Sequence, residues 1–177
     1  MPDQGNNGVS IERIEDRSIV SLKVSRNSLD GVGDRLQLAA PLRASNGDPQ
    51  SLWVGPDQWL LVSDAASPDA IIEHCRASLA DVLHNAVDNS AGLAAFRIDG
   101  LGTRELLATG SGVDFRPAAF SAGRCCRTRF AGIAAIIVAQ DSQQFEIYVD
   151  RSYEIYLSAW LSDSLKIAAC AGAGGAG

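Results

Sequence analysis

The stretch from Leu52 to Ser63, LWVGPDQWLLVS, constrains the fold more than any other part of the chain. Two apolar runs flank Gly55-Pro56-Asp57-Gln58, where proline fixes φ at the value that suits the second position of a turn. The Asp57 side chain can close such a turn. The pattern therefore predicts a strand, a tight turn and a second strand, with Trp53 and Trp59 on either side of the turn. Because both runs are apolar, we expect this hairpin inside a sheet, as part of a core without chemistry.

Length and composition exclude several classes of protein. A chain of 177 residues with 46% hydrophobic and 20% charged residues can fill one core. Its net charge of −6 argues against nucleic acid as a partner. The longest apolar run, Ile133 to Ala139, suits a buried strand and is too short to span a membrane. The first residues, MPDQGNNGVS, lack the features of a signal peptide, so we expect a cytoplasmic protein that binds no membrane.

Periodicity predicts an alternation of strands and helices along the chain. Residues 1–8 are expected to be disordered, residues 9–167 to form a single α+β domain, and residues 168–177 to be a flexible Ala/Gly tail. The first six expected elements follow the ferredoxin-like βαββαβ order, and the rest suggests a related unit that shares strands with it. Strands are predicted at 19–24, in the Trp hairpin, and at 93–98, 127–139 and 145–149, and helices at 28–38, 68–83, 103–108 and from Ser152 onward.

Groups that could carry chemistry are few. No glycine-rich phosphate-binding motif follows a strand into a helix. The two histidines, His74 and His84, fall on one expected helix but off its apolar stripe, so we expect surface residues. Cys125 and Cys126 are adjacent and form no CxxC pair, which leaves a vicinal-thiol redox role as a remote alternative to buried thiols. We therefore expect no catalytic, cofactor-binding or metal-binding residue in this chain.

One concentration of positive charge stands out in an acidic protein. Arg124, Arg127 and Arg129 follow one another closely, near Arg104 and Arg116 in the sequence. Such a cluster can bind an anion or an acidic partner, but it can equally be ordinary solvated charge on a strand and loop. The sequence leaves both interpretations open.

Several short motifs together resemble the gamma subunit of heterotetrameric sarcosine oxidase. The hairpin is similar to that family's LGPDEWLL signature, and the order and spacing of the other motifs agree over roughly residues 20–165. The residues of the signature for which a structural role is implied are Trp53, Gly55, Pro56, Asp57, Trp59, Gly100 and Gly110. The matching stretches are 53–61, 87–90, 96–100, 106–110, 113–115, 117–128, 145–149, 151–152 and 160–161.

That family is similar in turn to the folate-binding domain of the glycine-cleavage T protein. The resemblance implies two intertwined ferredoxin-like units that share an antiparallel-rich sheet. In the T protein, a strand reading roughly GGVxDD places acidic groups at the folate site. Ala134 and Ala135 stand at the corresponding positions here. A methyl group can neither take a proton nor stabilise an iminium, so that reaction is not expected in this chain.

The resemblance implies a non-catalytic subunit of an oxidoreductase that supports assembly. The whole enzyme would demethylate sarcosine, pass the one-carbon unit to tetrahydrofolate and produce hydrogen peroxide. FAD, FMN and NAD would belong to the alpha and beta subunits and zinc to the delta subunit, with the alpha subunit as the main contact. Whether the complex acts on sarcosine or another N-methyl amine is left open.

Two alternatives come from other classes of protein. One is a stand-alone folate-dependent aminomethyl or one-carbon transferase, which Ala134 and Ala135 disfavour. The other is a non-catalytic folate-binding regulator that uses Arg124, Arg127 and Arg129 to hold the glutamate tail of folate.

Overall fold

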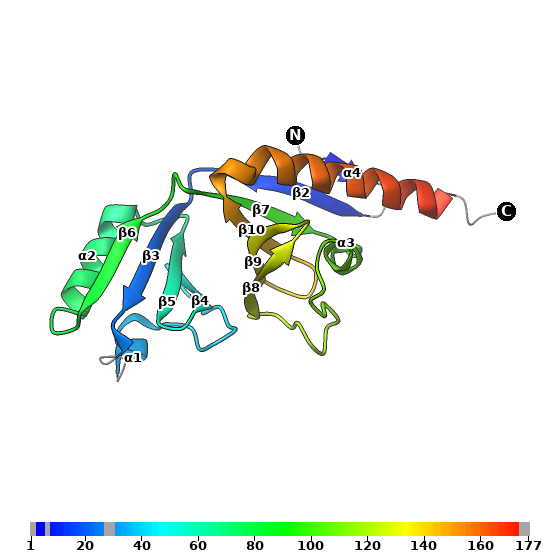
Figure 1. Cartoon of the computed structure of the whole chain (residues 1–177). Coiled ribbons are helices and arrows are strands. Elements are labelled where there is room, and N and C mark those ends of the chain that lie inside the picture. The colour runs from blue at the N-terminus through cyan, green and yellow to red at the C-terminus, as the bar shows by residue number, and fades with distance from the viewer. Residues whose placement is uncertain (1–2, 6–7, 27–30, 174–177) are drawn as a thin grey trace. The chain divides into compact units, whose positions relative to one another are not determined.

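A computed structural model describes residues 3–5, 8–26 and 31–173 of the chain, with side chains for 8–26 and 31–167 (Figure 1). The described residues form two compact units, each of which is assembled from separate segments of the chain. Unit 1 takes its residues from Met1–Ile14, Ala94–Ala122 and Thr128–Gly177. Unit 2 takes its residues from Glu15–Leu93 and Gly123–Arg127.

Unit 2 has the ferredoxin-like order of elements that the sequence predicts. Its four-stranded sheet has the order β4-β5-β3-β6, and the pairs β3–β5, β3–β6 and β4–β5 are all antiparallel. The elements in chain order are β3 (Ser18–Val24), α1 (Val32–Leu36), β4 (Gln50–Gly55), β5 (Gln58–Ser63), α2 (Pro68–Ser78) and β6 (His84–Asp88).

The Trp hairpin is part of this sheet, but only β5 lies inside it; β4 is the outermost strand, so the expectation of a hairpin away from the sheet edge is wrong for β4. Both faces of β5 are buried, because Trp59 and Leu61 join the core on one face while Leu60 and Val62 are shielded on the other. Pro56 and Asp57 form the turn, and Asp57 has a φ of 62°. The expected closure by the Asp57 side chain is replaced by a longer-range contact, since its carboxylate accepts a hydrogen bond from Arg26 Nε at 2.9 Å.

Helix α2 supplies the other half of the unit 2 core. Ser67 caps it by accepting a hydrogen bond from the backbone N–H of Ala70, and Pro68 occupies the first turn, as the sequence predicts. The helix lies beside the unit 2 sheet (Figure 1), and its apolar stripe belongs to the same core cluster as Val20, Leu22 and Val24. The buried residues of this stripe are Ile71, Cys75 and Leu79.

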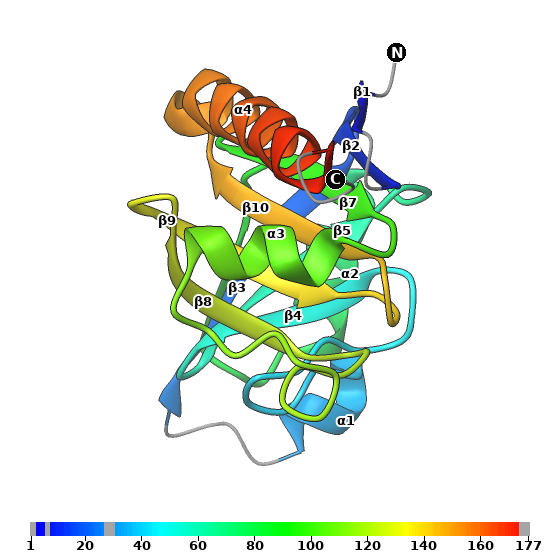
Figure 2. The same ribbon diagram turned by 90° about the vertical axis from the view of Figure 1, so that its right-hand side faces the viewer.

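Unit 1 has a six-stranded sheet of order β1-β2-β7-β10-β9-β8, with α3 and α4 on one face (Figure 2). The order β2-β7-β10-β9 is again ferredoxin-like, but β2 comes from the N-terminal end of the chain and takes the place of a strand that would follow α4. The elements are β1 (Asp3–Gly5), β2 (Val9–Ile14), β7 (Leu93–Asp99), α3 (Thr103–Gly110), β8 (Cys125–Phe130), β9 (Ile133–Ala139), β10 (Phe145–Asp150), the 3₁₀ turn η2 (Arg151–Tyr153) and α4 (Glu154–Ala173).

The predicted α+β class with antiparallel-rich, ferredoxin-like units is confirmed, while the way in which the units interleave differs from the expectation. Each unit has its own sheet, and two strands of the unit 1 sheet begin in unit 2, β7 with Leu93 and β8 with Cys125–Arg127. The predicted strand at 93–98 is β7 of unit 1, and the sixth element of unit 2 is β6. Whether both units behave as one domain over residues 9–167 stays a prediction.

Several element boundaries also differ from the sequence-based expectation. The predicted strand 127–139 is two strands, because Ala131 and Gly132 turn the chain at φ values of 49° and 84°. The predicted helix 28–38 contains only α1, and residues 27–30 lie outside the described part. Helix α2 ends at Ser78, so His84 lies on β6 and not on a helix with His74.

The two chain ends carry more regular structure than their composition predicts. β1 lies within the segment 1–8, which is predicted to be disordered. It is a strand because it pairs antiparallel with β2. α4 continues to Ala173, six residues into the predicted tail, where alanine favours helix. Residues 174–177 lie outside the described part. Among the residues that the structure describes, no helix combines the length and apolar character needed to cross a bilayer.

Candidate functional site

The hairpin residues of the family signature have structural roles in unit 2. Trp59 is 9% exposed and donates its indole N–H to the Ala39 carbonyl oxygen at 2.9 Å. Trp53 and Trp59 are directly paired across β4 and β5, and the register shifts between Trp53 and Gly55. The Asp57 carboxylate accepts a hydrogen bond from Arg26, and the Asp57 carbonyl oxygen accepts one from the Val24 N–H at 3.0 Å. The signature therefore fixes the end of a core hairpin and supplies no reactive group.

Gly100 and Gly110, the other two signature residues predicted to be structural, allow close approaches in unit 1. Gly100 follows β7 with a φ of 128°, a conformation that L side chains rarely adopt. Gly110 ends α3, where a Cβ atom would lie 2.6 Å from Phe130 and 2.9 Å from Trp160. Phe130 and Trp160 form an edge-to-face pair with centroids 5.0 Å apart, so α3 approaches this pair only because residue 110 has no side chain.

The arginines of the predicted anion or partner surface have different environments. Arg127 and Arg129 are exposed on β8, while Arg124 is half-buried just before it, beside Arg43 in an isolated bridge. Arg124 and Arg127 belong to unit 2 and Arg129 to unit 1, where Arg129 donates to the Gly132 carbonyl oxygen at 2.7 Å. An anion-binding role for the three stays a prediction.

Arg104, near these residues in the sequence, is part of the unit 1 framework. Its guanidinium donates to the carbonyl oxygens of Phe115, Phe120 and Ser142, the last two at 2.9 and 3.0 Å. It also lies 4.8 Å from the centroid of the Phe145 ring. Arg104 therefore holds two loops against β10 and is committed to that framework.

Arg116 is occupied by a local partner. It forms paired hydrogen bonds with Asp114, two residues earlier, and the pair lowers the pKa of the Asp114 carboxyl to about 2. Both side chains remain largely solvated, at 84% and 42% exposure. This local pair leaves little positive charge from Arg116 for a shared surface.

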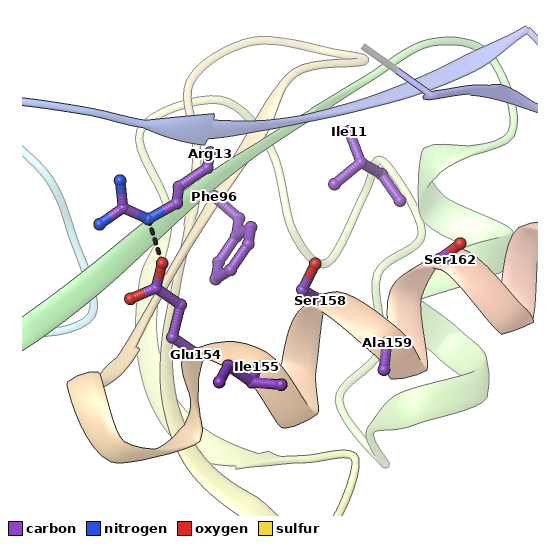
Figure 3. A pocket seen from close by; sticks show the side chains of 8 residues that line it. All are labelled: Ile11, Arg13, Phe96, Glu154, Ile155, Ser158, Ala159 and Ser162. Atoms are coloured by element: carbon purple, nitrogen blue, oxygen red, sulfur yellow. Dashed lines mark ion pairs between the residues drawn. The ribbon is translucent and has the colours of Figure 1, made fainter. Parts of the chain in front are cut away.

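A depression in unit 1 lies between α4 and the sheet (Figure 3). It has a volume of about 570 Å³, with Arg13 and Phe96 on the sheet side and an ion pair between Arg13 and Glu154 at one end. Ile155 on α4 is 85% exposed beside it. Its lining residues are Ile11, Arg13, Phe96, Glu154, Ile155, Ser158, Ala159 and Ser162. This mixture of apolar and hydroxyl groups suits contact with another surface and contains no nucleophile with a base beside it.

The pKa of the Glu154 carboxyl, at the end of this depression, should depend on its two arginine partners, Arg13 and Arg151. The pKa of Glu154 lies below its ordinary value, chiefly through the 2.7 Å hydrogen bond from Arg151 and then through the charge of Arg13. We expect the substitution Arg151→Gln to raise this pKa toward the ordinary range and Arg13→Gln to raise it as well. Carbon-detected NMR of the Glu154 carboxyl across a pH titration measures both changes.

The sign of the stability effect follows from that direction. A lowered pKa in the folded state adds stability that is present above the ordinary pKa of glutamate and is lost as the pH falls through the lowered value. The matched control is Lys166→Gln, which removes the partner of Asp163 on the same helix and should leave the Glu154 titration unchanged. An unaltered titration in both arginine variants would contradict the assignment.

A buried polar network on β10 was not predicted from the sequence. Glu146 is 2% exposed, and its carboxylate accepts hydrogen bonds from Tyr148 Oη at 2.6 Å and Gln140 Nε2 at 3.0 Å. The Arg97 guanidinium on β7 lies 3.4 Å from the Glu146 carboxylate. The same guanidinium lies 3.8 Å from the carboxylate of Glu12 on β2. The only sequence signal is a glutamate within the apolar strand FEIYVD. The Glu146 carboxylate is satisfied by these donors, which favours a structural over a catalytic role, whereas Arg97 Nε is buried without a hydrogen-bond partner among the described residues.

The cysteines are poorly suited to redox chemistry. Burial raises the pKa of the Cys125 thiol to about 12 and those of Cys75 and Cys126 to about 11. These three thiols are free, and Cys125 donates weakly to the Trp53 carbonyl oxygen at 3.4 Å. Because the thiolate is the reactive form, the buried-thiol interpretation of Cys125 and Cys126 is favoured over a redox switch. In the described part of the chain, no three His, Cys, Asp or Glu side chains converge as a metal site would require.

The two alanines at the expected acidic positions lie on β9. Ala134 is exposed and Ala135 is buried on the opposite face, at 2% exposure. Ala135 is paired with Val149 across the sheet. Neither position offers a group that can transfer a proton.

Two solved protein structures have a similar fold. The chain is similar to a chain of the heterotetrameric sarcosine oxidase from Corynebacterium sp. U-96, with a TM-score of 0.82 and 20% identity over 93% of this chain and 87% of that one. It is also similar to the glycine cleavage system aminomethyltransferase T from Bartonella henselae, with a TM-score of 0.61 and 11% identity over 89% of this chain and 46% of that one. At such identities the likeness shows the fold. No curated protein matches the chain.

The sequence also matches the model of a protein family. The model of the family described as "Sarcosine oxidase, gamma subunit family" matches residues 25–166, which is most of the chain. The match includes the Trp hairpin, Gly100 and Gly110, whose structural roles are given above. The chain therefore belongs to the sarcosine oxidase gamma subunit family.

Proposed function

We propose that this chain is the non-catalytic gamma subunit of a heterotetrameric sarcosine oxidase and supports the assembly of that complex. Its family membership over residues 25–166 is the observation that carries the proposal. The whole complex would convert sarcosine to glycine, transfer the one-carbon unit to tetrahydrofolate and produce hydrogen peroxide.

The residues of the chain are consistent with a supporting role. Two charged groups with several partners each, Glu146 and Arg104, bind other parts of unit 1. Alanine stands at both positions where the T protein carries carboxylates, and the Cys75 and Cys125 thiols are buried. Large apolar side chains, by contrast, are exposed, as expected for a subunit that buries surface against a partner. The most exposed are Leu83, Leu101, Ile155 and Ile167.

The partners and cofactors follow from the proposed complex. The alpha subunit would be the main contact, with the beta and delta subunits in the same assembly. FAD, FMN and NAD would be held by the alpha and beta subunits and zinc by the delta subunit, with none bound by this chain. A cytoplasmic location is part of this proposal.

Co-purification tests the proposal directly. A tagged copy is co-expressed with its genomic neighbours, isolated by the tag and examined by gel electrophoresis and by its flavin absorbance spectrum. We expect a yellow complex that contains large flavoprotein subunits, whereas the tag alone should retain none. A colourless, folded monomer in the presence of well-expressed neighbours would contradict the proposal. Tetrahydrofolate titration of that monomer, with and without Arg124, Arg127 and Arg129, would then test the folate-binding alternatives.

A further inference from the structure

β6 is the outermost strand of the unit 2 sheet, and its outer edge has no partner among the described residues. The Ser25 N–H donates to the Leu83 carbonyl oxygen at 2.8 Å and the Asn89 N–H to that of Ile19 at 2.8 Å. The antiparallel register between these bonds alternates bonded and non-bonded residues. Asn85 and Val87 therefore direct their backbone groups toward β3. His84, Ala86 and Asp88 direct theirs away from the sheet.

The other sheet edges are protected. The outer groups of β4 are taken by residues 43–45, because Trp53 donates to the Arg43 carbonyl oxygen at 3.0 Å and the Ser51 carbonyl oxygen accepts from Ser45 at 2.8 Å. β1 has only three residues. β8 begins with a hydrogen bond from Cys125 to Leu42 and then exposes Arg127 and Arg129, which discourage strand addition.

β6 has only one charged residue, Asp88 at its end, and has apolar side chains beside the open edge. Val87 is 49% exposed and Leu83, just before the strand, is 77% exposed. Side chains alternate between the two faces of a strand. Because Ala86 packs against the core that contains α2, Leu83 and Val87, which are an odd number of residues away from it, lie on the opposite face. No lysine, proline or bulge interrupts the strand. The edge thus combines free backbone donors and acceptors with apolar contact surface.

The other face of this edge has a hollow of about 290 Å³ between α2 and β6. Its lining residues are Ile72, Arg76, His84, Asn85 and Ala86. Arg76 pairs with Glu73, but a guanidinium has five donors and that contact uses only part of them. A side chain that enters this hollow from an added strand would therefore be a hydrogen-bond acceptor.

We infer that β6 is a docking edge for an extended segment of a partner subunit, which adds a fifth strand to the unit 2 sheet. An extended backbone is the occupant because the outward groups repeat at every second residue, a spacing that another strand matches and that a helix does not. The docked segment has apolar side chains toward Leu83 and Val87, alternating with acceptor side chains toward Arg76 and His84. This inference rests on the proposed function, since that function supplies the partner.

Residue-resolved hydrogen exchange separates the inference from the proposed function. In the isolated chain, the amides of Asn85 and Val87 should be protected and those of His84, Ala86 and Asp88 should exchange rapidly. In the purified complex all five should be protected. A yellow complex in which His84, Ala86 and Asp88 still exchange rapidly would overturn the docking edge and leave the subunit role intact. Failure to form any complex would overturn both.

A pair of matched substitutions provides the second test. Val87→Lys places a cation on the edge and should lower the amount of co-purified partner about tenfold, equivalent to about 1.4 kcal/mol. Ala118→Lys introduces the same cation at an exposed residue of unit 1 outside the β6 edge, and should leave co-purification unchanged. Circular dichroism of both isolated variants checks that they fold. Equal co-purification by the two folded variants would count against β6 as the docking edge.

Discussion

Replacing Gly100 with alanine is expected to destabilise unit 1 by about 4 kcal/mol, enough to remove most of the stability of a typical domain. A Cβ atom at this position would lie 1.7 Å from the Gly8 carbonyl oxygen and 2.9 Å from Val9 Cα. These are backbone atoms next to β2, so no side-chain rotation relieves the clash. The φ of 128° adds a conformational penalty of about 1–3 kcal/mol for any residue with a side chain. Urea denaturation followed by circular dichroism measures the change.

Gly112→Ala is the matched control for that substitution. A Cβ atom at Gly112 would meet no other atom within 4 Å, so this variant should stay within about 0.5 kcal/mol of the parent protein. A Gly100→Ala protein with the parent's denaturation midpoint would mean that β2 does not approach β7 as described.

The second large effect is expected from Arg97, which neutralises the buried Glu146. The substitution Arg97→Met should cost about 3 kcal/mol, because it leaves a carboxylate at 2% exposure without its cation. Tyr148 and Gln140 still donate to Glu146, and Arg97 itself is 32% exposed, so the cost should lie at the lower end for a broken buried pair.

A double-mutant cycle separates the loss of charge balance from the loss of packing. Adding Glu146→Gln removes the buried charge at almost constant volume, so the double variant should be more stable than Arg97→Met alone. Glu12→Gln serves as the control, because Glu12 is 64% exposed and 3.8 Å from Arg97, and should change stability by less than about 0.5 kcal/mol. Additive effects of the two substitutions in urea denaturation would show that the network carries no coupling.

Local signals explain the elements that the sequence predicts correctly. The Trp hairpin is predicted because its turn residues and both of its strands are adjacent, and α2 because Ser67 and Pro68 mark its start. β6, with the sequence HNAVD, has one residue that strongly favours a strand and exists through its pairing with β3. β2 likewise depends on β7, far along the chain, where Ile11 pairs with Ile98.

The candidate sites depend even more on distant pairing. Strand periodicity places Arg127 and Arg129 on one face of a strand, and the structure exposes both. Nothing local indicates that Glu146 meets Arg97, since β7 and β10 are brought together only by the whole sheet. The open edge of β6 is a property of what lies beside the strand, which no local window of sequence contains.

The position of β2 in unit 1 has a consequence for synthesis on the ribosome. All four strands of the unit 2 sheet, residues 18–88, are translated before β7 is complete. β2 is made before these four strands but pairs with β7, and the sheet it joins also needs β10, which ends at Asp150. Unit 2 can therefore assemble its sheet while the chain is still growing, whereas β2, although made before that sheet, must wait for β7 to be translated before it can join its own.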